Sequence, residues 1–352
     1  MNSFNKRFRQ QLWFKLLVAV LSLAAIVVAI IFGIAVGETS IPPKVVYEVL
    51  SNHLFNTTFP VDPLDDGIVW NYRLTRALVS ACCGAGLAVS GVILQSLLRN
   101  ALAEPYLLGI SAGASTGAVL VTIVGVGGGA ISMTVGAFFG AVFAFALVAL
   151  LAHAAGGDGL RNGGQIVLAG IAGSQLFNAL TSLIITKSGS AEQARGIMFW
   201  LLGSLGGARW SDVSVAFPTI IVGGAICLVL ARALDAFIFG TESAASLGIP
   251  VRRVQITLLL VAAMMTSVMV SMVGAIGFVG LVIPHTARMI VGVRHQVLIP
   301  ASMVLGAIFL IASDVASRIL IMGQVLPIGV ITALVGAPVF AVILLKRSGR
   351  RS

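Results

Sequence analysis

The sequence has few charged residues. Asp, Glu, Lys and Arg make up 10% of its 352 residues, whereas soluble domains carry about 25%. A chain with so little charge cannot cover a water-facing surface, which excludes a soluble globular protein. Instead, 58% of the residues are hydrophobic and the mean hydropathy is +1.06. The first apolar run, 16–36, is long enough to cross a hydrocarbon core of about 30 Å, so we predict an integral membrane protein.

That first run follows a cluster of basic residues, as the apolar core of a signal peptide does. The core of a secretory signal, however, spans about 7–15 residues and ends at a small-x-small cleavage site. The run 16–36 is longer, and no clear cleavage site follows it. We therefore expect an uncleaved first span.

The residues of catalytic and metal sites are also scarce. The three cysteines, Cys82, Cys83 and Cys227, lie inside apolar segments, and the four histidines are scattered. Buried single thiols behave as small hydrophobic groups, so neither a disulfide framework nor a metal site is expected. No HExxH motif, nucleophile elbow or acid–base constellation occurs, and no lysine follows a glycine, so the P-loop pattern GxxxxGK[ST] is absent. We predict that the chain is not an enzyme, that it binds no cofactor, and that a partner uses ATP and Mg²⁺ for any ATP-driven work.

Ten apolar segments are long or apolar enough to enter a membrane. They predict an all-α polytopic fold in one transmembrane domain, 1–352. The segments are about 14–36, 74–97, 106–126, 130–154, 164–186, 212–233, 254–273, 277–292, 298–319 and 327–346. The eighth is short and contains Pro284, His285 and Arg288, so a broken or half-depth element is expected there.

The basic residues predict the orientation. The net charge of +10 could indicate nucleic acid, but the basic residues lie at the ends of apolar segments, without interleaved aromatics. Ten spans put both termini on one side, and placing that side in the cytoplasm leaves seven of the 22 Lys and Arg outside, as the positive-inside rule predicts. The external seven are Lys44, Arg73, Arg76, Lys187, Arg195, Arg209 and Arg318.

Glycines recur at four-residue intervals inside several segments. Small residues let membrane helices approach closely, so helix packing explains them. The glycines assigned to packing are Gly84, Gly91, Gly109, Gly113 and Gly117.

A weak internal similarity links 86–95 with 266–277. Each stretch leads from an apolar span into polar residues punctuated by a proline. The two spans are five apart and therefore have opposite orientations. This spacing predicts an inverted repeat of spans 2–5 and 7–10, a common plan in transporters.

Uncharged polar residues form a stripe on the fifth segment. Most of its members share one helical face, which suits the wall of a wet path for a polar solute, although hydrogen bonds between helices explain the stripe equally well. The candidate pore-lining residues are Ser174, Asn178, Thr181 and Ser182, with Gln175 beside them and Gln95 as a similar case in the second segment.

Arginines gather at the predicted outer ends of spans. Arg73 and Arg76 are three apart and point the same way on a helix, and guanidinium groups suit bidentate capture of carboxylates. They could instead be membrane anchors, but they lie on the side that the charge rule disfavours, so an acidic external partner would compensate them. Asp314 and Arg318 are four apart in the ninth segment and predict a local ion pair.

The stretch 240–250 interrupts a predicted cytoplasmic loop. Thr241 is a plausible N-cap, Glu242 falls in the first turn, and Gly248 with Pro250 beyond it ends the helix. These ends predict a short cytosolic helix that could dock into a cleft of another protein. The turn 99–105, between spans 2 and 3, is where a channel along span 2 would have to close.

Several motifs together resemble a known family. They include RLTR (73–76), LLRNALAEPYLLG (97–109), GTESAASLG (240–248), GAIGFVGLVIPHTARMIVG (274–292) and SDVASRI (313–319). In this order they resemble the FecCD-type permease subunits of ABC importers for iron chelates and vitamin B12, from residue 73 to near the C-terminus. Two departures stand out, because Thr75 and Ala101 replace prolines that are usual in the family. The residue at 241 is more often acidic there.

The resemblance implies partners and sites. The subunit would lie in a bacterial cytoplasmic membrane and dimerise with a second copy or a paralogue. Two ABC ATPase subunits would bind its cytoplasmic side, and a periplasmic or lipid-anchored substrate-binding protein would dock on its outer side. Arg73, Arg76 and Arg318 would receive glutamates of the binding protein, and Asn100 and Leu102 would form part of a cytoplasmic gate. The ATPase-coupling residues would be Thr241, Glu242, Ser243, Leu247 and Gly248.

The cargo implied by the family is a ferric siderophore first, with haem and cobalamin as alternatives. An ion-coupled secondary transporter is a rival from another class. It predicts buried carboxylates near the middle of the membrane, and apart from Asp314, near a span end, none is placed there by the sequence. A membrane scaffold is a further rival, but it would not need both a capped cytosolic helix and a polar stripe.

Overall fold

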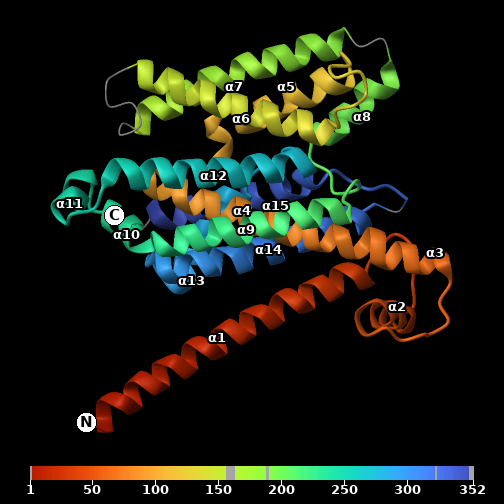
Figure 1. Ribbon diagram of the computed structural model, residues 1–352, viewed down its shortest axis with the longest axis horizontal. Coiled ribbons are helices and arrows are strands. Elements are labelled where there is room, and N and C mark those ends of the chain that lie inside the picture. The colour runs from red at the N-terminus through yellow and green to blue at the C-terminus, as the bar shows by residue number, and fades with distance from the viewer. Residues whose placement is uncertain (1, 156–162, 188–189, 322, 349–352) are drawn as a thin grey trace.

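The computed structural model describes residues 2–155, 163–187, 190–321 and 323–348. In those residues every regular element is a helix (Figure 1). Within this described part of the chain, seven helices are long and apolar enough to cross a membrane. Three of the basic residues that predict the orientation, Arg161, Arg350 and Arg351, lie outside the described part of the chain.

The N-terminal third contains one long helix and several short ones before the first central span. Helix α1 runs from Asn2–Ala35, α2 from Pro43–Phe55 and α3 from Pro63–Asp66. A π-helical segment, η1 (Gly67–Leu74), then leads directly into α4 (Thr75–Leu97). Helices α2 and α3, each of which begins with a proline at its first position, were not expected from hydropathy.

The ten predicted segments are all helical, but the third is shorter than predicted. After α4 come a 3₁₀ turn, η2 (Pro105–Leu108), and then α5 (Ile110–Thr122), a helix of 13 residues. The prediction of a full span over 106–126 was therefore wrong. Gly109 lies at the N-cap of α5 with φ +75°, a left-handed conformation that breaks the helix and favours glycine. Gly109 is accordingly a helix breaker and not a packing residue within a helix.

The remaining helices complete two sets joined by short elements. The first set ends with α6 (Met133–Ala154) and α7 (Gly163–Thr186). The elements that join it to the second set are α8 (Ala191–Leu201), α9 (Trp210–Val229), α10 (Ala231–Phe237) and α11 (Thr241–Ser246). The second set is α12 (Val251–Val273), α13 (Val279–Val291), α14 (His295–Ile319) and α15 (Ile328–Ser348).

The two sets, α4–α7 and α12–α15, have matching lengths and exchanged contacts. Their helices contain 23, 13, 22 and 24 residues against 23, 13, 25 and 21. Helix α4 packs on α13 and α14 of the other set, while α12 packs on α5 and α6, and α4 also contacts α12. This is the arrangement that the inverted repeat predicts, with a half-length second helix in each copy.

The chain before each half-length helix enters the bundle and meets its counterpart. The Tyr106 hydroxyl donates to the backbone oxygen of Ile276 and accepts from its N–H, both at 2.7 Å. Pro105 lies against Gly280, beside the backbone oxygen of Leu87 in the middle of α4. Irregular backbone at this depth needs such partners, because lipid supplies none.

Close glycine contacts hold the central helices together. A Cβ on Gly84 would lie 2.1 Å from the oxygen of Gly306, and one on Gly91 would lie 2.0 Å from that of Gly280. Gly113 and Gly117 make the corresponding contacts with α6, at 2.4 and 2.1 Å from its carbonyl oxygens. Any side chain at these positions would push the helices apart.

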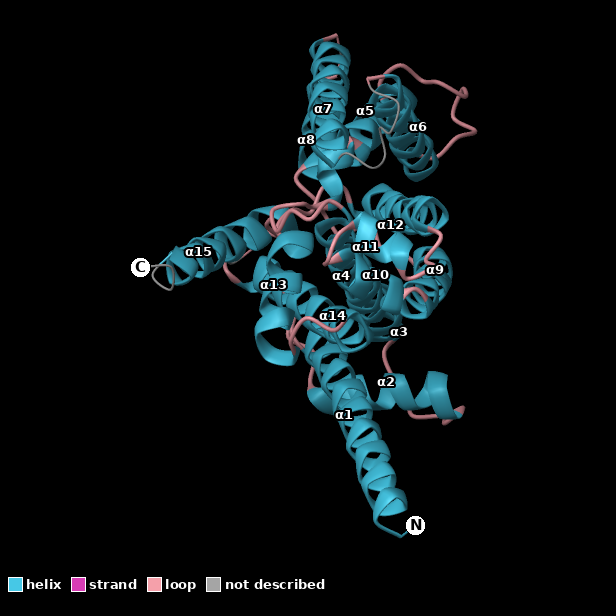
Figure 2. Cartoon of the chain, turned by 90° about the vertical axis from the view of Figure 1, so that its left-hand side faces the viewer, coloured by secondary structure: helices cyan, strands magenta, loops and turns pink. Residues whose placement is uncertain are grey.

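Helices α5–α8 form a group on one side of the remaining bundle (Figure 1). Helix α4 is buried along most of its length, whereas α1 and α7 expose most of their apolar residues. In the rotated view α15 and α1 extend away from the bundle in different directions (Figure 2). We call the end that carries α2, α3 and the start of α4 the outer end, and the end that carries α11 and the start of α14 the inner end.

Candidate transport and coupling sites

The outer arginines form a buried network around one carboxylate. Asp314 Oδ1 accepts from Arg76 Nε at 2.6 Å, and Asp314 Oδ2 lies 2.9 Å from Arg318 Nη2. Arg76 also donates to the Tyr72 hydroxyl at 2.7 Å. The exposed fractions of Arg76, Asp314 and Arg318 are 2%, 1% and 3%. The predicted Asp314–Arg318 ion pair is confirmed within α14, and the Arg76–Asp314 pair joins α4 to α14.

Two of the outer arginines also bind the end of α1. Arg318 donates to the backbone oxygens of Gly33 and Val36 at 3.0 and 2.9 Å. Arg73 donates to the backbone oxygen of Ile34 at 3.0 Å and also bonds that of Thr39. The last carbonyls of a helix have no partner within the helix, and here two guanidinium groups from other elements bind them, with the favourable charge for a helix C-terminus.

These contacts correct one premise of the docking prediction. The sequence argument was that something should compensate Arg73 and Arg76, and that an acidic external partner would do so. The structure compensates them internally, with Asp314 and backbone oxygens, and Arg318 has no edge free toward the outside since all three side chains are at most 3% exposed. Docking through these three arginines would require them to leave these partners.

The inner turn after α4 is shaped by Asn100. Its Oδ1 accepts from the N–H of Leu102 at 2.9 Å, and its backbone oxygen accepts from Ala103 N–H at 3.1 Å. Arg99 takes a left-handed conformation with φ +50°. The turn leaves Leu102 51% exposed, so of the two predicted gate residues Asn100 fixes the backbone and Leu102 presents an apolar side chain. Further along, burial raises the pKa of Glu104, opposed by the backbone N–H of Phe278.

The predicted coupling helix is α11, with its start shifted by one residue. Gly240 is the N-cap, so Thr241 is the first helical residue and makes no capping bond through its side chain. Gly248 has φ +80° just beyond the helix, as predicted for a helix end. Ala244 is buried against the bundle, and α11 contacts α10 and α12. The other coupling candidates, Glu242, Ser243, Leu247 and Gly248, are exposed, and Leu247 is 73% exposed.

The polar stripe on α7 divides into two parts. Thr181 is buried, and its hydroxyl lies 2.8 Å from that of Thr116 on α5, so it joins two helices and does not face a path through this chain. Ser174 is half-buried. The exposed part consists of Gln175, Asn178 and Ser182. Gln95 lies elsewhere: it is 4% exposed and donates to the oxygen of Gly280 at 3.0 Å.

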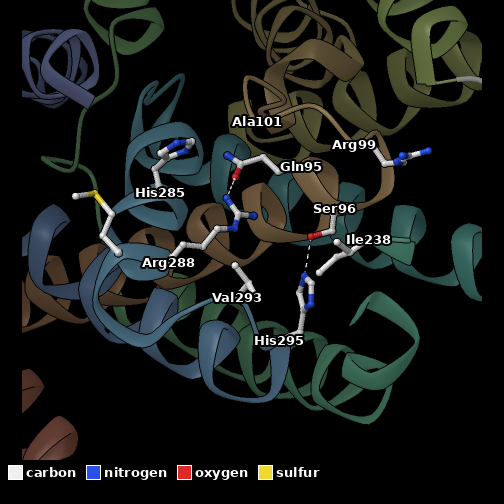
Figure 3. A pocket seen from close by; sticks show the side chains of 10 residues that line it. Gln95, Ser96, Arg99, Ala101, Ile238, His285, Arg288, Val293 and His295 are labelled. Atoms are coloured by element: carbon white, nitrogen blue, oxygen red, sulfur yellow. Dashed lines mark hydrogen bonds between the residues drawn. The ribbon is translucent and has the colours of Figure 1, made fainter. Parts of the chain in front are cut away.

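The inner end contains a polar pocket of about 520 Å³, lined in part by Gln95 and Arg288. Figure 3 shows these two side chains pointing toward one another, and the guanidinium donates to Gln95 Oε1. On the opposite wall His295 Nδ1 lies 2.6 Å from Asp235 Oδ1, and His295 Nε2 lies 2.7 Å from the Ser96 hydroxyl. This chain of bonds connects α10, α14 and α4.

Sequence reasoning missed the hydrogen bonds that link Asp235, His295 and Ser96, and it also missed the Tyr106–Ile276 contact. Asp235, His295 and Ser96 come from three separate segments, and their separations along the sequence are 60 and 199 residues. The available signal was that each is a polar residue at the inner end of an apolar helix. A tyrosine such as Tyr106, at the end of a polar turn, gives no signal of the partner 170 residues away.

A comparison with family models decides the membership. The model of the FecCD transport family matches residues 25–346. The chain is a FecCD permease. It shares 40% identity over 287 residues with the cobalamin import system permease protein of Halobacterium salinarum, covering 80% of this chain and 74% of the relative. It shares 37% over 293 residues with the hemin transport system permease protein of Yersinia pestis, covering 81% and 85%.

A solved structure also resembles the FecCD permease. It is described as an inward-facing conformation of a putative metal-chelate type ABC transporter, with a TM-score of 0.79 and 29% identity over 94% of this chain and 99% of that one. The chain is therefore a permease subunit of the type II ABC importer family, a multi-pass membrane protein that is not itself an enzyme.

Proposed function

We propose that this FecCD permease imports a metal chelate across the cytoplasmic membrane of a bacterium. The observation that carries the proposal is the family match over 25–346 together with the structural likeness to a metal-chelate type ABC transporter. The relatives named above are permeases for cobalamin and haemin. Cobalamin and haemin are both large organic molecules that hold a metal ion.

The path for the cargo lies between two permease subunits, this chain and a second copy or paralogue. Its support is the exposed face of α7, where Gln175, Asn178 and Ser182 alternate with apolar residues such as Leu176, which is 52% exposed. Helix α15, which extends from the bundle (Figure 2), also exposes Leu334 at 65%. Faces of this kind are buried when a second subunit packs on them, and the polar residues then line the path.

The energy comes from two ATPase subunits that bind ATP and Mg²⁺ at the inner end. The sequence has no P-loop of its own. Helix α11 offers the contact surface, since Leu247 and Glu242 are exposed while Ala244 anchors the helix to the bundle. A push on α11 passes through α10 to Asp235 and from there, through His295 and Ser96, to the end of α4. The gate residues Asn100 and Leu102 follow directly in the chain.

A substrate-binding protein delivers the chelate at the outer end. The buried arginine network holds α1, α4 and α14 together there, so we assign Arg73, Arg76 and Arg318 the task of shaping the docking surface. Direct pairing with glutamates of the binding protein predicts something different. If R73Q weakens binding of that protein without lowering the thermal stability of the permease, direct pairing is correct. If R73Q lowers the thermal stability of the permease as well, shaping is correct.

The test is cargo uptake together with partner identification. The tagged permease should co-purify from its own membranes with a P-loop ATPase, and cells expressing the complete set should take up one radiolabelled chelate. The panel contains a ferric siderophore, the first expectation, with haem and cobalamin as alternatives. Uptake of none of these by cells with all subunits present would contradict the metal-chelate proposal. Uptake driven by an ion gradient without ATPase would favour the rival secondary transporter.

A further inference from the structure

The inner pocket has the composition of an anion site. It is lined by residues of α4, the turn after it, Ile238 beyond α10, α13 and the start of α14, and Arg288 points across it toward Gln95 while the guanidinium of Arg99 points away (Figure 3). None of its lining residues, all within the described part of the chain, is acidic. The nearest carboxylate bonded to a lining residue is that of Asp235, and its Oδ1 accepts twice from His295, from the backbone N–H at 2.9 Å and from the ring.

Arg288 retains donors for a ligand. A guanidinium has five N–H donors in a planar fork that fits phosphate and carboxylate. The Arg288 side chain donates from Nη1 to Oε1 of Gln95, an uncharged acceptor. The outer Arg318, by contrast, bonds a carboxylate and three backbone oxygens. The half-buried Arg288 thus carries a positive charge into the cavity, and no carboxylate of the described residues is paired with it.

The rim of the pocket is apolar and exposed. Met289, Val293 and Ile238 line it, with exposed fractions of 66%, 61% and 45%. These side chains extend the surface of α13, where Ile290 is 65% exposed. A ligand that fits both parts has an anionic group for the cavity and an apolar tail for α13. Basic pockets between membrane helices at the cytoplasmic level bind phospholipid headgroups in this way.

We propose that this pocket binds a phosphate-bearing anion. The apolar rim favours the headgroup of an anionic phospholipid over free phosphate, because the rim contacts the lipid tail. The phosphate accepts from the free N–H groups of Arg288, while an acyl chain follows Met289 and Val293. The walls belong to the inner turn, to α10 and to α13, so the bound headgroup holds these elements at their present spacing. The inference does not depend on which cargo the permease carries.

The experiment measures binding of three probes to the purified full-length protein in a neutral detergent. The probes are short-chain phosphatidylglycerol, short-chain phosphatidylcholine and inorganic phosphate, titrated by native mass spectrometry. Both lipids carry a phosphate, but the choline cation of phosphatidylcholine is repelled by the guanidinium of Arg288, so phosphatidylglycerol should bind about tenfold more tightly than phosphatidylcholine. R288Q should lose this preference. The matched control is R294Q, which removes an exposed arginine at the same end that does not line the pocket.

A second pair of variants tests the rim without touching a buried group. Met289 is exposed, so M289E and M289K should both fold, with thermal unfolding as the check. M289E should weaken phosphatidylglycerol binding and M289K should strengthen it. Equal affinities for the two lipids, or equal losses in R288Q and R294Q, would overturn the site. Inorganic phosphate that binds as tightly as phosphatidylglycerol would overturn the lipid as the source while supporting the phosphate site.

Discussion

The two ends of the molecule use arginine in opposite ways. At the outer end Arg73, Arg76 and Arg318 are almost fully buried and bond a carboxylate, a tyrosine and the last carbonyls of α1. At the inner end Arg288 is half-buried beside a cavity and bonds one amide oxygen. The comparison teaches that the position of an arginine at a span end does not reveal its role. What decides it is how many of its donors the protein itself satisfies.

The largest effect is expected from D314N. The amide leaves Arg76 and Arg318 buried without their shared negative charge, and loss of one partner in a buried ion pair costs about 3–5 kcal/mol. The control is E48Q, a carboxyl-to-amide change in the pair of Lys44 and Glu48, 3.7 Å apart, whose lysine is exposed, where less than about 1 kcal/mol is expected. Thermal unfolding of the purified permease compares them. Equal unfolding temperatures would show that the outer network does not hold the helices.

G84A should have the next largest effect. A Cβ at Gly84 would lie 2.1 Å from the oxygen of Gly306, so α4 and α14, which the outer arginines join, must separate. Overpacking of this kind costs about 1–3 kcal/mol. G196A is the matched control, because no atom lies within 4 Å of a Cβ at Gly196. If both variants unfold at the same temperature, the close approach of α4 and α14 is not needed.

T181V and N178L separate helix packing from the transport path on α7. T181V removes the buried bond to Thr116 and should lower the free energy of unfolding by about 1 kcal/mol, with little change in uptake. N178L changes an exposed side chain and should leave stability unchanged while lowering cargo uptake. The reverse pattern, with stability lost in N178L and uptake lost in T181V, would show that the division of the stripe is wrong.

The smallest effect is a pH dependence at Glu104. Glu104 is a carboxyl whose pKa is raised by burial. The folded state then holds the proton more tightly than the unfolded state, so this group's contribution to stability is present at acidic pH. It is lost as the pH rises from the ordinary value, about 4.3, through the raised value. E104Q should therefore be more stable than the parent at neutral pH, and the difference should vanish at acidic pH. Parallel stability curves would contradict this.

Hydropathy predicted the helices of the ten apolar segments, because a span needs about 20 apolar residues, but it did not predict α2 and α3. It failed at α5, where residues 106–108 are as apolar as a helix but Gly109 turns left-handed and Tyr106 bonds Ile276 across the bundle. The half-depth α13 was predictable because Pro284, His285 and Arg288 lie inside its segment.

The outer network could not be predicted beyond the pair of Asp314 and Arg318, which are four residues apart. Arg76 bonds Asp314 across 238 residues of sequence, and Arg318 bonds Gly33 across 285. No local pattern encodes such contacts. The motif at 240–248 did reveal its helix, since its ends are marked by residues next to it.

The most direct test of the account is transport by purified components in sealed vesicles. The account predicts that the permease imports a metal chelate only when its ATPase partner and ATP are present with the binding protein, and that an ion gradient alone moves nothing. Chelate accumulation by the permease alone under an ion gradient would contradict it.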